Sequence, residues 1–187
     1  RQVCDRFNVN STLSSQDCTS GTDRLVEFSE TSNANIFINV QGDEPMIPVG
    51  VIVDFYNHVL RNQETCIGIS RIFDENVLNS KSVVKVASSD NRLIYASRNP
   101  IGMNIDEHAP TYFKHTGIYG FTRDGLRSFG SYDKGPLETF ENVEILRLIE
   151  RNIPVQVYEL PNFGRAVDTL DDFIFVNKYG KFSGPTR

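Results

Sequence analysis

Short runs of β-branched and other apolar residues alternate along the chain with stretches in which apolar residues recur at helical spacing. The first continuous apolar run, 36–40, contains a single Asn and ends in the turn-forming residues QGDEP. A run of this kind is typical of a buried strand that leads into a polar loop. By the same criteria we expect further strands at 66–72, 83–87, 93–97, 116–121 and 155–160.

Prolines and aspartates mark where the expected helices begin. Pro48 can occupy the first turn of an amphipathic helix. Pro136 begins a longer one, which the pattern predicts to run without interruption to about Arg151. A last helix is expected to start with Asp168 as its N-cap residue and Asp171 at its third position.

Strands that alternate with helices favour an α/β fold, in which a mostly parallel sheet is flanked by helices. A length of 187 residues is enough to bury one sizeable core, so we interpret 1–187 as a single domain. The opening residues 1–7 have the pattern of a helix end, whereas α/β nucleotide-binding domains usually begin with a strand and a phosphate-binding loop. We therefore expect that the first βα units of such a domain are missing.

The composition indicates which kinds of partner the protein can bind and in which cellular compartment it is expected. With 19 Lys and Arg against 24 Asp and Glu, the net charge of −5 lacks the basic excess of a nucleic-acid binder. The three cysteines are widely spaced and odd in number, which suggests neither a disulfide framework nor a metal site. No apolar run is long enough to cross a bilayer. These features favour a soluble cytoplasmic protein that binds neither nucleic acid nor membranes.

Two aspartates are candidate ligands for a metal ion. Asp43 follows the carboxyl end of a predicted strand, where ligands bind in open α/β sheets. A carboxylate there suits Mg²⁺ bound to substrate phosphates, and Asp168 could supply a second one from a distant loop. The alternatives are that Asp43 belongs to a simple turn and that Asp168 only caps a helix. The sequence alone favours these simpler interpretations.

Other polar residues have two interpretations each. Glu138, Glu141 and Glu144 recur every three residues, which is typical of a solvated helix face. Alternatively, Glu138 in the first turn could accept hydrogen bonds from sugar hydroxyls. His115 precedes a glycine-rich and aromatic segment, although an isolated histidine is more often structural than catalytic.

Arg98 and the segment SGTDR also have two interpretations each. Arg98 ends a predicted strand and could bind a carboxylate through two hydrogen bonds, although a surface ion pair is the default interpretation. Ser20, Gly21 and Thr22 could form a phosphate or ribose loop, but an ordinary helix start explains them equally well.

Five motifs together resemble one family, the 3-deoxy-manno-octulosonate cytidylyltransferases (CMP-Kdo synthetases). They occur in the family's order and approximate spacing over residues 3–175. The motifs are SGTDRL at 20–25, NVQGDEP at 39–45, HTGIYG at 115–120, PLE at 136–138 followed by Glu141, Glu144 and Arg147, and VDT at 167–169. Their shared order is far more specific than any one of them.

The resemblance implies a nucleotidyltransferase fold and an enzyme that converts CTP and Kdo to CMP-Kdo and pyrophosphate for lipopolysaccharide synthesis. It further implies Mg²⁺ as cofactor and a homodimer. Asp43 and Asp168 would be the catalytic residues that hold Mg²⁺. The residues implied for the sugar pocket are Gln41, Arg98, His115, Tyr119, Glu138 and Glu141, and those near the nucleotide are Ser20, Gly21 and Thr22.

Two departures from the family pattern keep alternatives open. The family's first strand and its Arg- and Lys-bearing loop, which grips the CTP phosphates, have no counterpart here, so we expect weak CTP binding by residues 1–187 alone. The segment 97–102 also differs from the family's usual sequence. The substrate could therefore be another ulosonic acid, such as 8-amino-Kdo or a sialic-acid-like sugar, or the chain could be a non-catalytic homologue.

Overall fold

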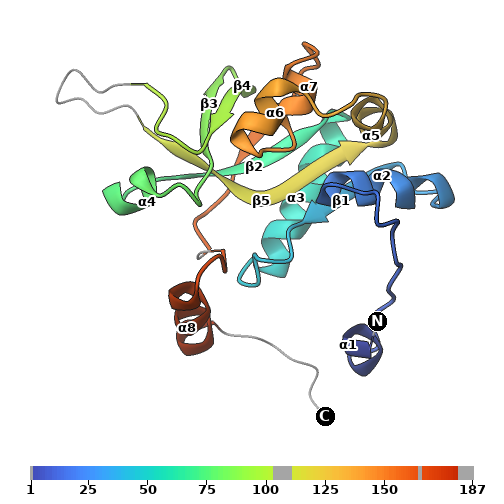
Figure 1. Ribbon diagram of the computed structural model, residues 1–187, viewed down its shortest axis with the longest axis horizontal. Helices are drawn as coiled ribbons and strands as arrows, with labels where there is room; N and C mark the ends of the chain where they lie inside the picture. The colour runs from blue at the N-terminus through green and yellow to red at the C-terminus, as the bar shows by residue number, and fades with distance from the viewer. Residues whose placement is uncertain (1, 103–110, 164–165, 181–187) are drawn as a thin grey trace.

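The computed structural model describes residues 2–102, 111–163 and 166–180 and places a six-stranded sheet at the centre of the fold (Figure 1). The strands follow one another across the sheet in the order β1-β5-β2-β6-β4-β3, with an additional pairing between β5 and β3. Their bounds are β1 Ile36–Val40, β2 Cys66–Arg71, β3 Lys85–Ser89, β4 Arg92–Ser97, β5 Phe113–Thr122 and β6 Gln156–Glu159. All six predicted strands are therefore present, with small shifts at their ends.

The sheet is mixed, and the prediction of a mostly parallel sheet was wrong. Among the described pairings only β2 and β6 run parallel. β1 and β2 point the same way, as expected for strands joined by a helix, but the long strand β5 lies between them and is antiparallel to both. The apolar pattern could not reveal this insertion, because a strand buried on both faces has the same composition in either direction.

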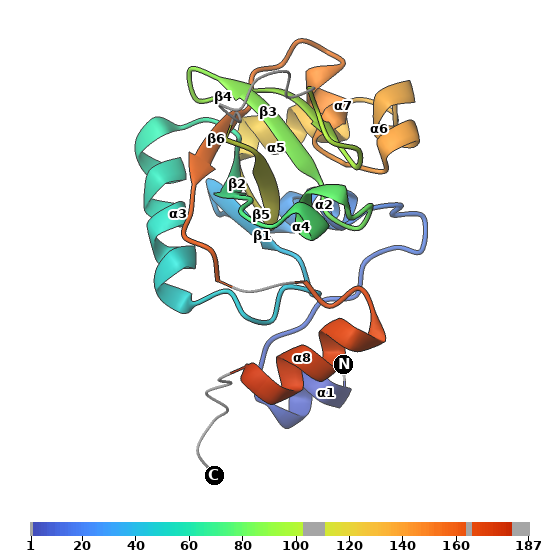
Figure 2. The same cartoon turned by 90° about the vertical axis from the view of Figure 1, so that its left-hand side faces the viewer.

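Helices cover the two faces of the sheet (Figure 2). The helices are α1 Gln2–Arg6, α2 Gly21–Thr31, α3 Val49–Asn62, α4 Glu75–Asn79, α5 Arg123–Gly130, α6 Pro136–Glu141, α7 Leu146–Ile149 and α8 Leu170–Tyr179. Helix α3 packs Phe55 and Val59 against one face, which forms the smaller apolar cluster. Helices α2, α5 and α7 cover the other face, where Phe129 and Leu146 belong to the larger cluster.

The long helix predicted from Pro136 to Arg151 is instead two short helices. Helix α6 ends at Glu141 because Asn142 adopts a left-handed conformation, with φ 52° and ψ 49°. Asparagine tolerates this conformation better than most residues, so it is a common helix terminator. The apolar stripe continued through the break, and its periodicity therefore concealed the turn.

The last helix begins one residue later than expected. Thr169, not Asp168, is the N-cap of α8. The Thr169 side chain accepts a hydrogen bond from the backbone N–H of Asp172, and the Asp172 carboxylate accepts one from the backbone N–H of Thr169. This reciprocal capping box satisfies the free amides of the first turn without Asp168. The Asp168 carboxylate is therefore available for another role.

Helices α1 and α8 project from the same side of the central body (Figures 1 and 2). Most apolar side chains of α8 are exposed, and only Val176 is buried. Within the described residues, no helix combines the length and the apolar character needed to cross a membrane.

Candidate active site

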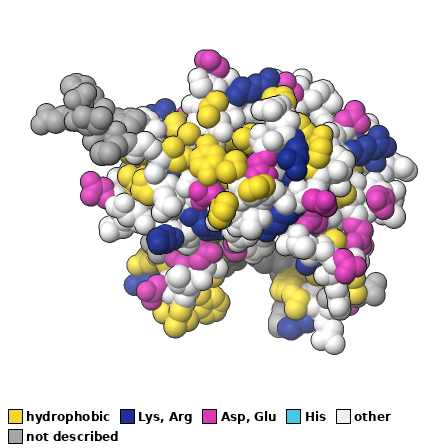
Figure 3. Space-filling view, turned by 45° about the horizontal axis from the view of Figure 1, so that its top comes forward, with side chains coloured by type: hydrophobic (Ala, Val, Ile, Leu, Met, Phe, Trp, Pro, Cys, Tyr) yellow, Lys and Arg dark blue, Asp and Glu magenta, His cyan; other side chains and the backbone are white. Residues whose placement is uncertain are grey.

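A cavity of about 700 Å³ opens at the edge of the body near α8. Side chains of both charges gather where α8 joins the body (Figure 3). Of the eleven predicted site residues, nine line the cavity: Ser20, Gly21, Gln41, Asp43, Arg98, His115, Tyr119, Glu138 and Asp168. The other two, Thr22 and Glu141, lie outside its lining.

Pairing of β1 with β5 brings two of the sequence motifs together. Asn39 lies opposite Tyr119 in the antiparallel register, and the Gln41 N–H donates to the carbonyl of Gly117 at 2.9 Å. Gly117 has φ +68°, and a Cβ atom at this position would lie 2.5 Å from Cγ of Glu44. Only glycine fits both the backbone conformation and this close approach.

The loops that carry Asp43 and Asp168 meet at one end of the cavity. The Val167 N–H donates to the carbonyl of Asp43 at 2.8 Å, which links two segments far apart in the sequence. Burial, followed by the nearby charges of Asp43 and Asp172, raises the pKa of Asp168. Two crowded carboxylates in a polar cavity are the kind of donors that Mg²⁺ uses in proteins.

The donor set fits Mg²⁺ better than a metal enclosed by protein ligands alone. No group of three or more His, Cys, Asp or Glu side chains is arranged to hold a metal among the residues that the structure describes. Mg²⁺ usually takes one or two carboxylates and completes its shell with water and substrate phosphates. Asp43 and Asp168 match that requirement.

Glu44 is a cavity residue that the sequence analysis missed. Burial raises its pKa to about 7, assisted by the charges of Asp43 and Asp168 and opposed by Lys114. Both Glu44 and Lys114 line the cavity. The position of Glu44 next to Asp43 was the only available signal, and a turn explained both residues equally well.

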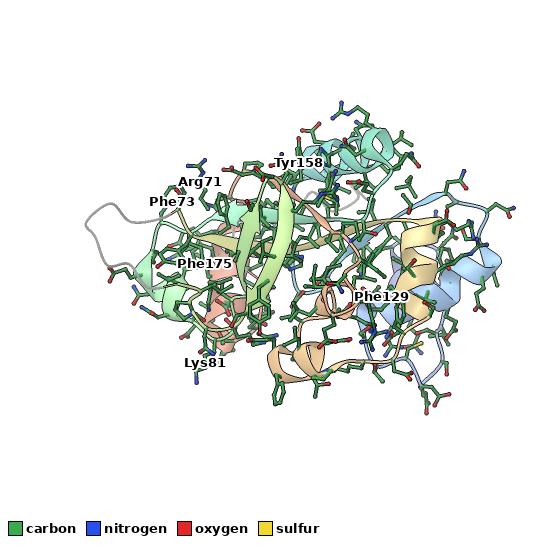
Figure 4. The ribbon with its side chains drawn as sticks, turned by 90° about the horizontal axis from the view of Figure 1, so that it is seen from above. Arg71, Phe73, Lys81, Phe129, Tyr158 and Phe175 are labelled. Carbon is green, nitrogen blue, oxygen red and sulfur yellow. The ribbon has the colours of Figure 1, made fainter. Side chains whose placement is uncertain are left out.

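Glu138 does not present a free carboxylate to the cavity. Its two oxygens accept hydrogen bonds from Nε and Nη2 of Arg147, at 2.7 and 2.8 Å, and only 1% of the residue is exposed. Nη1 of the same guanidinium donates to Asp23 at 2.7 Å, and the group lies 4.0 Å above the centroid of the Phe129 ring, a residue labelled in Figure 4. Arg147 therefore joins α2, α6 and α7, and of this network Glu138 lines the cavity.

This network persists although burial opposes a charge on Arg147. The hydrogen bonds to Glu138 and Asp23 outweigh the loss of hydration and raise the pKa of the guanidinium. In a straight helix, nine residues would separate Glu138 from Arg147 by about 13 Å along the axis. The turn at Asn142 is what allows the two side chains to pair.

The start of α2 is occupied by a carboxylate of the protein itself. The backbone N–H groups of Gly21 and Thr22 donate to the two oxygens of Glu144, at 3.1 and 3.0 Å, and Ser20 caps the helix by accepting from the Asp23 N–H. A helix N-terminus attracts anions, and Glu144 fills that role. These two amides are therefore not open to a nucleotide phosphate, and Thr22 is fully buried.

Arg98 and Glu141 bind each other and the neighbouring backbone. Nε of Arg98 donates to the carbonyl of Glu141 at 2.9 Å, and its terminal nitrogens donate to carbonyls of Lys81, Ser82 and Asn142. The carboxylate of Glu141 accepts hydrogen bonds from the Arg98 N–H and from two hydroxyl groups of β4. Arg98 lines the cavity, but its fork of donors is directed at backbone carbonyls.

His115 and Tyr119 form an uncharged part of the cavity wall. Their ring centroids lie 4.4 Å apart, and Nδ1 of His115 accepts a hydrogen bond from the Gly117 N–H at 3.3 Å. Burial lowers the pKa of His115 to about 4 and raises that of Tyr119. Nε2 of His115 is buried without a hydrogen-bond partner among the described residues. Such an atom can contact a ligand that enters the cavity.

Comparison with known proteins places this fold and site in a class. The family model described as cytidylyltransferase matches residues 1–157. A solved structure of CMP:2-keto-3-deoxy-manno-octonic acid synthetase complexed with CTP superposes with a TM-score of 0.86 at 30% identity, over 95% of this chain and 74% of that chain. An inositol-1-phosphate CTP transferase from T. maritima shares the fold with a TM-score of 0.62 at 14% identity, over 91% of this chain and 65% of that one. The chain is thus a nucleotidyltransferase-like α/β protein.

Curated relatives define the family more narrowly. The 3-deoxy-manno-octulosonate cytidylyltransferase of Solibacter usitatus is 35% identical over 95% of this chain and 72% of its own length. That of Acidobacterium capsulatum is also 35% identical, over 84% of this chain and 65% of its own length. The chain belongs to the 3-deoxy-manno-octulosonate cytidylyltransferase family, whose members are enzymes. It spans roughly two thirds to three quarters of the length of these relatives.

The buried ion network gives a prediction on stability. Arg147→Met should lower the free energy of unfolding by about 3–5 kcal/mol, because it leaves two buried or half-buried carboxylates without their partner. Arg127→Met is the matched control, since Arg127 forms an exposed pair with Asp124 at 3.5 Å and should change stability by less than about 0.5 kcal/mol. Chemical denaturation measures both; equal losses would contradict the structural role of Arg147.

The lowered pKa of His115 gives a prediction on pH. Below about pH 6.5 the unfolded chain protonates this imidazole, whereas the folded protein resists protonation until about pH 4. Stability should therefore fall as the pH decreases through this window. Compared with His115→Asn, the wild type should lose about 2 kcal/mol more between pH 7 and about pH 4.5 in urea unfolding. A constant difference between the two proteins would show that His115 is not buried in a neutral form.

Proposed function

We propose that this protein transfers CMP from CTP to 3-deoxy-manno-octulosonate and releases pyrophosphate. The observation that carries the proposal is the meeting of the Asp43 and Asp168 loops, joined by the hydrogen bond from Val167, in a cavity of about 700 Å³. A nucleotide and an acidic sugar are compatible with a cavity of this size. Family membership supplies the class of reaction and the Kdo substrate.

The reaction needs the sugar's anomeric hydroxyl to attack the α-phosphorus of CTP in line with the departing pyrophosphate. In this proposal the protein acts mainly by holding both substrates in that geometry. Asp43 and Asp168 would hold Mg²⁺, which when bound offsets negative charge on the phosphates. Cations elsewhere on the cavity wall, Lys114 and Lys134, would contact the substrates' anionic groups.

The sugar side of the cavity would be formed by Gln41, His115 and Tyr119, which offer uncharged polar groups to hydroxyls. We assign Glu138 a supporting role there instead of direct sugar binding, because Arg147 engages both of its oxygens. For the nucleotide, Ser20 and Gly21 remain the residues of the α2 start that line the cavity. Glu141 supports Arg98 from outside the lining.

The proposal is tested with the complete protein, including any residues that flank 1–187, in a pyrophosphate-release assay with CTP, Mg²⁺ and Kdo. Asp43→Asn and Asp168→Asn should each reduce the rate by about 100-fold or more, because the electrostatic compensation for the phosphates is lost. Asp171→Asn is the matched control on the first turn of α8, outside the cavity lining, and should stay within about twofold of the wild type.

Parallel assays with 8-amino-Kdo and sialic-acid-like sugars decide whether the altered segment after Arg98 has changed the sugar. Release with one of these sugars and none with Kdo would replace the proposed substrate but keep the reaction. An inactive complete protein with every ulosonic acid would remove the proposal and favour the non-catalytic alternative.

We also propose a homodimer, on the basis of family membership, and Phe73, two residues beyond the end of β2, is an exposed position at which it can be tested (Figure 4). Phe73 is 83% exposed, so burial of its ring in an interface would remove apolar surface from water. Light scattering should give twice the monomer mass, and Phe73→Ser should shift the equilibrium towards monomer. Phe140→Ser on α6, with a similar exposure of 85%, is the comparison variant that shows whether a change in mass is specific to Phe73. A monomeric wild type at micromolar concentration would refute the dimer.

A further inference from the structure

The first residue of α2, Gly21, leaves a small open point in the wall of the cavity. An ideal Cβ atom at this position would lie 3.5 Å from Nδ2 of Asn39, 3.5 Å from Nε2 of Gln41 and 3.6 Å from Oε1 of Glu144. Gly21, Gln41 and Glu144 all line the cavity. Polar atoms from β1, from the loop that follows it and from the connection between α6 and α7 therefore surround one point beside Gly21.

Gln41 and Glu144 offer opposite hydrogen-bonding groups at this point. Nε2 of Gln41 is a donor, and the Gln41 side chain makes no hydrogen bond within the part of the chain that the structure describes. Among the described residues, Oε1 of Glu144 accepts a hydrogen bond only from the Gly21 N–H, at 3.1 Å, so one of its two lone pairs remains. A single ligand atom between the two groups can therefore bind both.

The backbone holds both groups in place before any ligand arrives. The Gln41 N–H donates to the carbonyl of Gly117 at 2.9 Å, which fixes the start of that loop against β5. The second oxygen of Glu144 accepts from the Thr22 N–H at 3.0 Å, so the carboxylate is bound through both oxygens. Two-point binding of a carboxylate fixes its orientation. Little further ordering is needed when a ligand binds here.

A hydroxyl group is the ligand that satisfies both partners. Its oxygen can accept from Gln41 while its proton is donated to Glu144. An oxygen of an ionised phosphate or carboxylate only accepts, and the charge of Glu144 would repel it. A methylene group would leave both polar groups without a partner, which is unfavourable once water is displaced. Because Gly21 has no Cβ atom, a hydroxyl can approach close to the backbone.

We propose that Gly21, Gln41 and Glu144 form a subsite for one hydroxyl group of a substrate. The inference rests on the proposed function for the identity of the substrates, since CTP and Kdo both carry hydroxyl groups. The family resemblance assigns Gly21 to the nucleotide and Gln41 to the sugar, so the subsite lies where the two expected regions meet. Glu144, to which the resemblance gave no ligand, contacts substrate directly.

Gly21→Ala fills this point without disturbing the fold. Distances of 3.5 and 3.6 Å are ordinary van der Waals contacts, and the backbone of Gly21 does not have a positive φ. The variant should be at least as stable as the wild type in urea unfolding, because alanine favours a helix more than glycine. It should nevertheless bind one substrate about 10- to 100-fold more weakly, because a hydrogen bond to a charged group is lost. Isothermal titration calorimetry on the complete protein measures CTP with Mg²⁺ and Kdo separately.

Gly50→Ala is the matched control. It is the same substitution in the first turn of another helix, α3, but Gly50 lies outside the cavity lining. Apart from its chain neighbours and the backbone of its own helix, no described atom lies within 4 Å of the added Cβ. This variant should bind both substrates within about twofold of the wild type. Gln41→Met, which keeps the side-chain length but removes the donor, should weaken the same substrate as Gly21→Ala.

The two titrations identify which substrate carries the hydroxyl. If Gly21→Ala weakens CTP alone, 2′-deoxy-CTP or 3′-deoxy-CTP should bind the wild type more weakly by a similar factor. That analogue should lose nothing further in the variant, because both changes remove the same contact. If the variant weakens Kdo alone, the hydroxyl belongs to the sugar.

Several results would overturn the subsite. They are unchanged binding of both substrates in Gly21→Ala, equal weakening of both, a loss of stability in this variant, and a wild type that binds neither CTP nor Kdo. An effect on CTP that neither deoxy analogue reproduces would also overturn it, because the lost contact would then not involve a ribose hydroxyl.

These outcomes are separate from those for the proposed function. The expected binding pattern without pyrophosphate release would remove the proposed function and leave the hydroxyl subsite intact. Pyrophosphate release by the wild type, together with unchanged substrate binding in Gly21→Ala, would instead remove the subsite and leave the proposed function.

Discussion

The buried guanidinium of Arg147 is the interaction on which the candidate site depends. It carries a full charge into the interior, which is favourable only if partners replace the lost water. Glu138 supplies a bidentate partner, Asp23 a third hydrogen bond and Phe129 an aromatic face. Because these groups belong to different helices, the requirement to neutralise one cation fixes α2, α6 and α7 relative to one another. Because Glu138 lines the cavity, that arrangement fixes one part of the cavity wall.

The same principle of internal compensation operates around the rest of the cavity. The Glu144 carboxylate binds the backbone N–H groups at the start of α2, and the side chains of Arg98 and Lys85 donate hydrogen bonds to backbone carbonyls. Groups of the protein itself therefore stabilise each of these charges. By contrast, burial and then the charges of Asp43 and Asp172 raise the pKa of Asp168. Asp43 and Asp168 are the carboxylates that the proposed Mg²⁺ would use.

Residues of different sequence motifs contact one another in the folded protein, so the motifs do not consist only of groups that bind substrate. The glycine of HTG accommodates Glu44 of QGDEP, the aspartate of SGTDR binds Arg147, and the PLE glutamate completes that ion network. Three residues that the resemblance assigned to the sugar pocket, Glu138, Arg98 and Glu141, are engaged by other groups of the protein. Their spacing in the family pattern is equally consistent with a requirement to build the site and with a requirement to contact the sugar or nucleotide.

The sequence by itself determined the strands, the approximate starts of α3, α6 and α8, the α/β class and the motifs that identify the family, because apolar periodicity and turn residues act locally. It did not determine the direction of β5, the break at Asn142 or the cap at Thr169. Tertiary structure decided these features. An inserted antiparallel strand looks like any buried strand, and the turn at Asn142 is needed only because Glu138 must reach Arg147. The burial of Lys85 was likewise invisible, since the three backbone carbonyls that bind it are brought together only when the chain has folded.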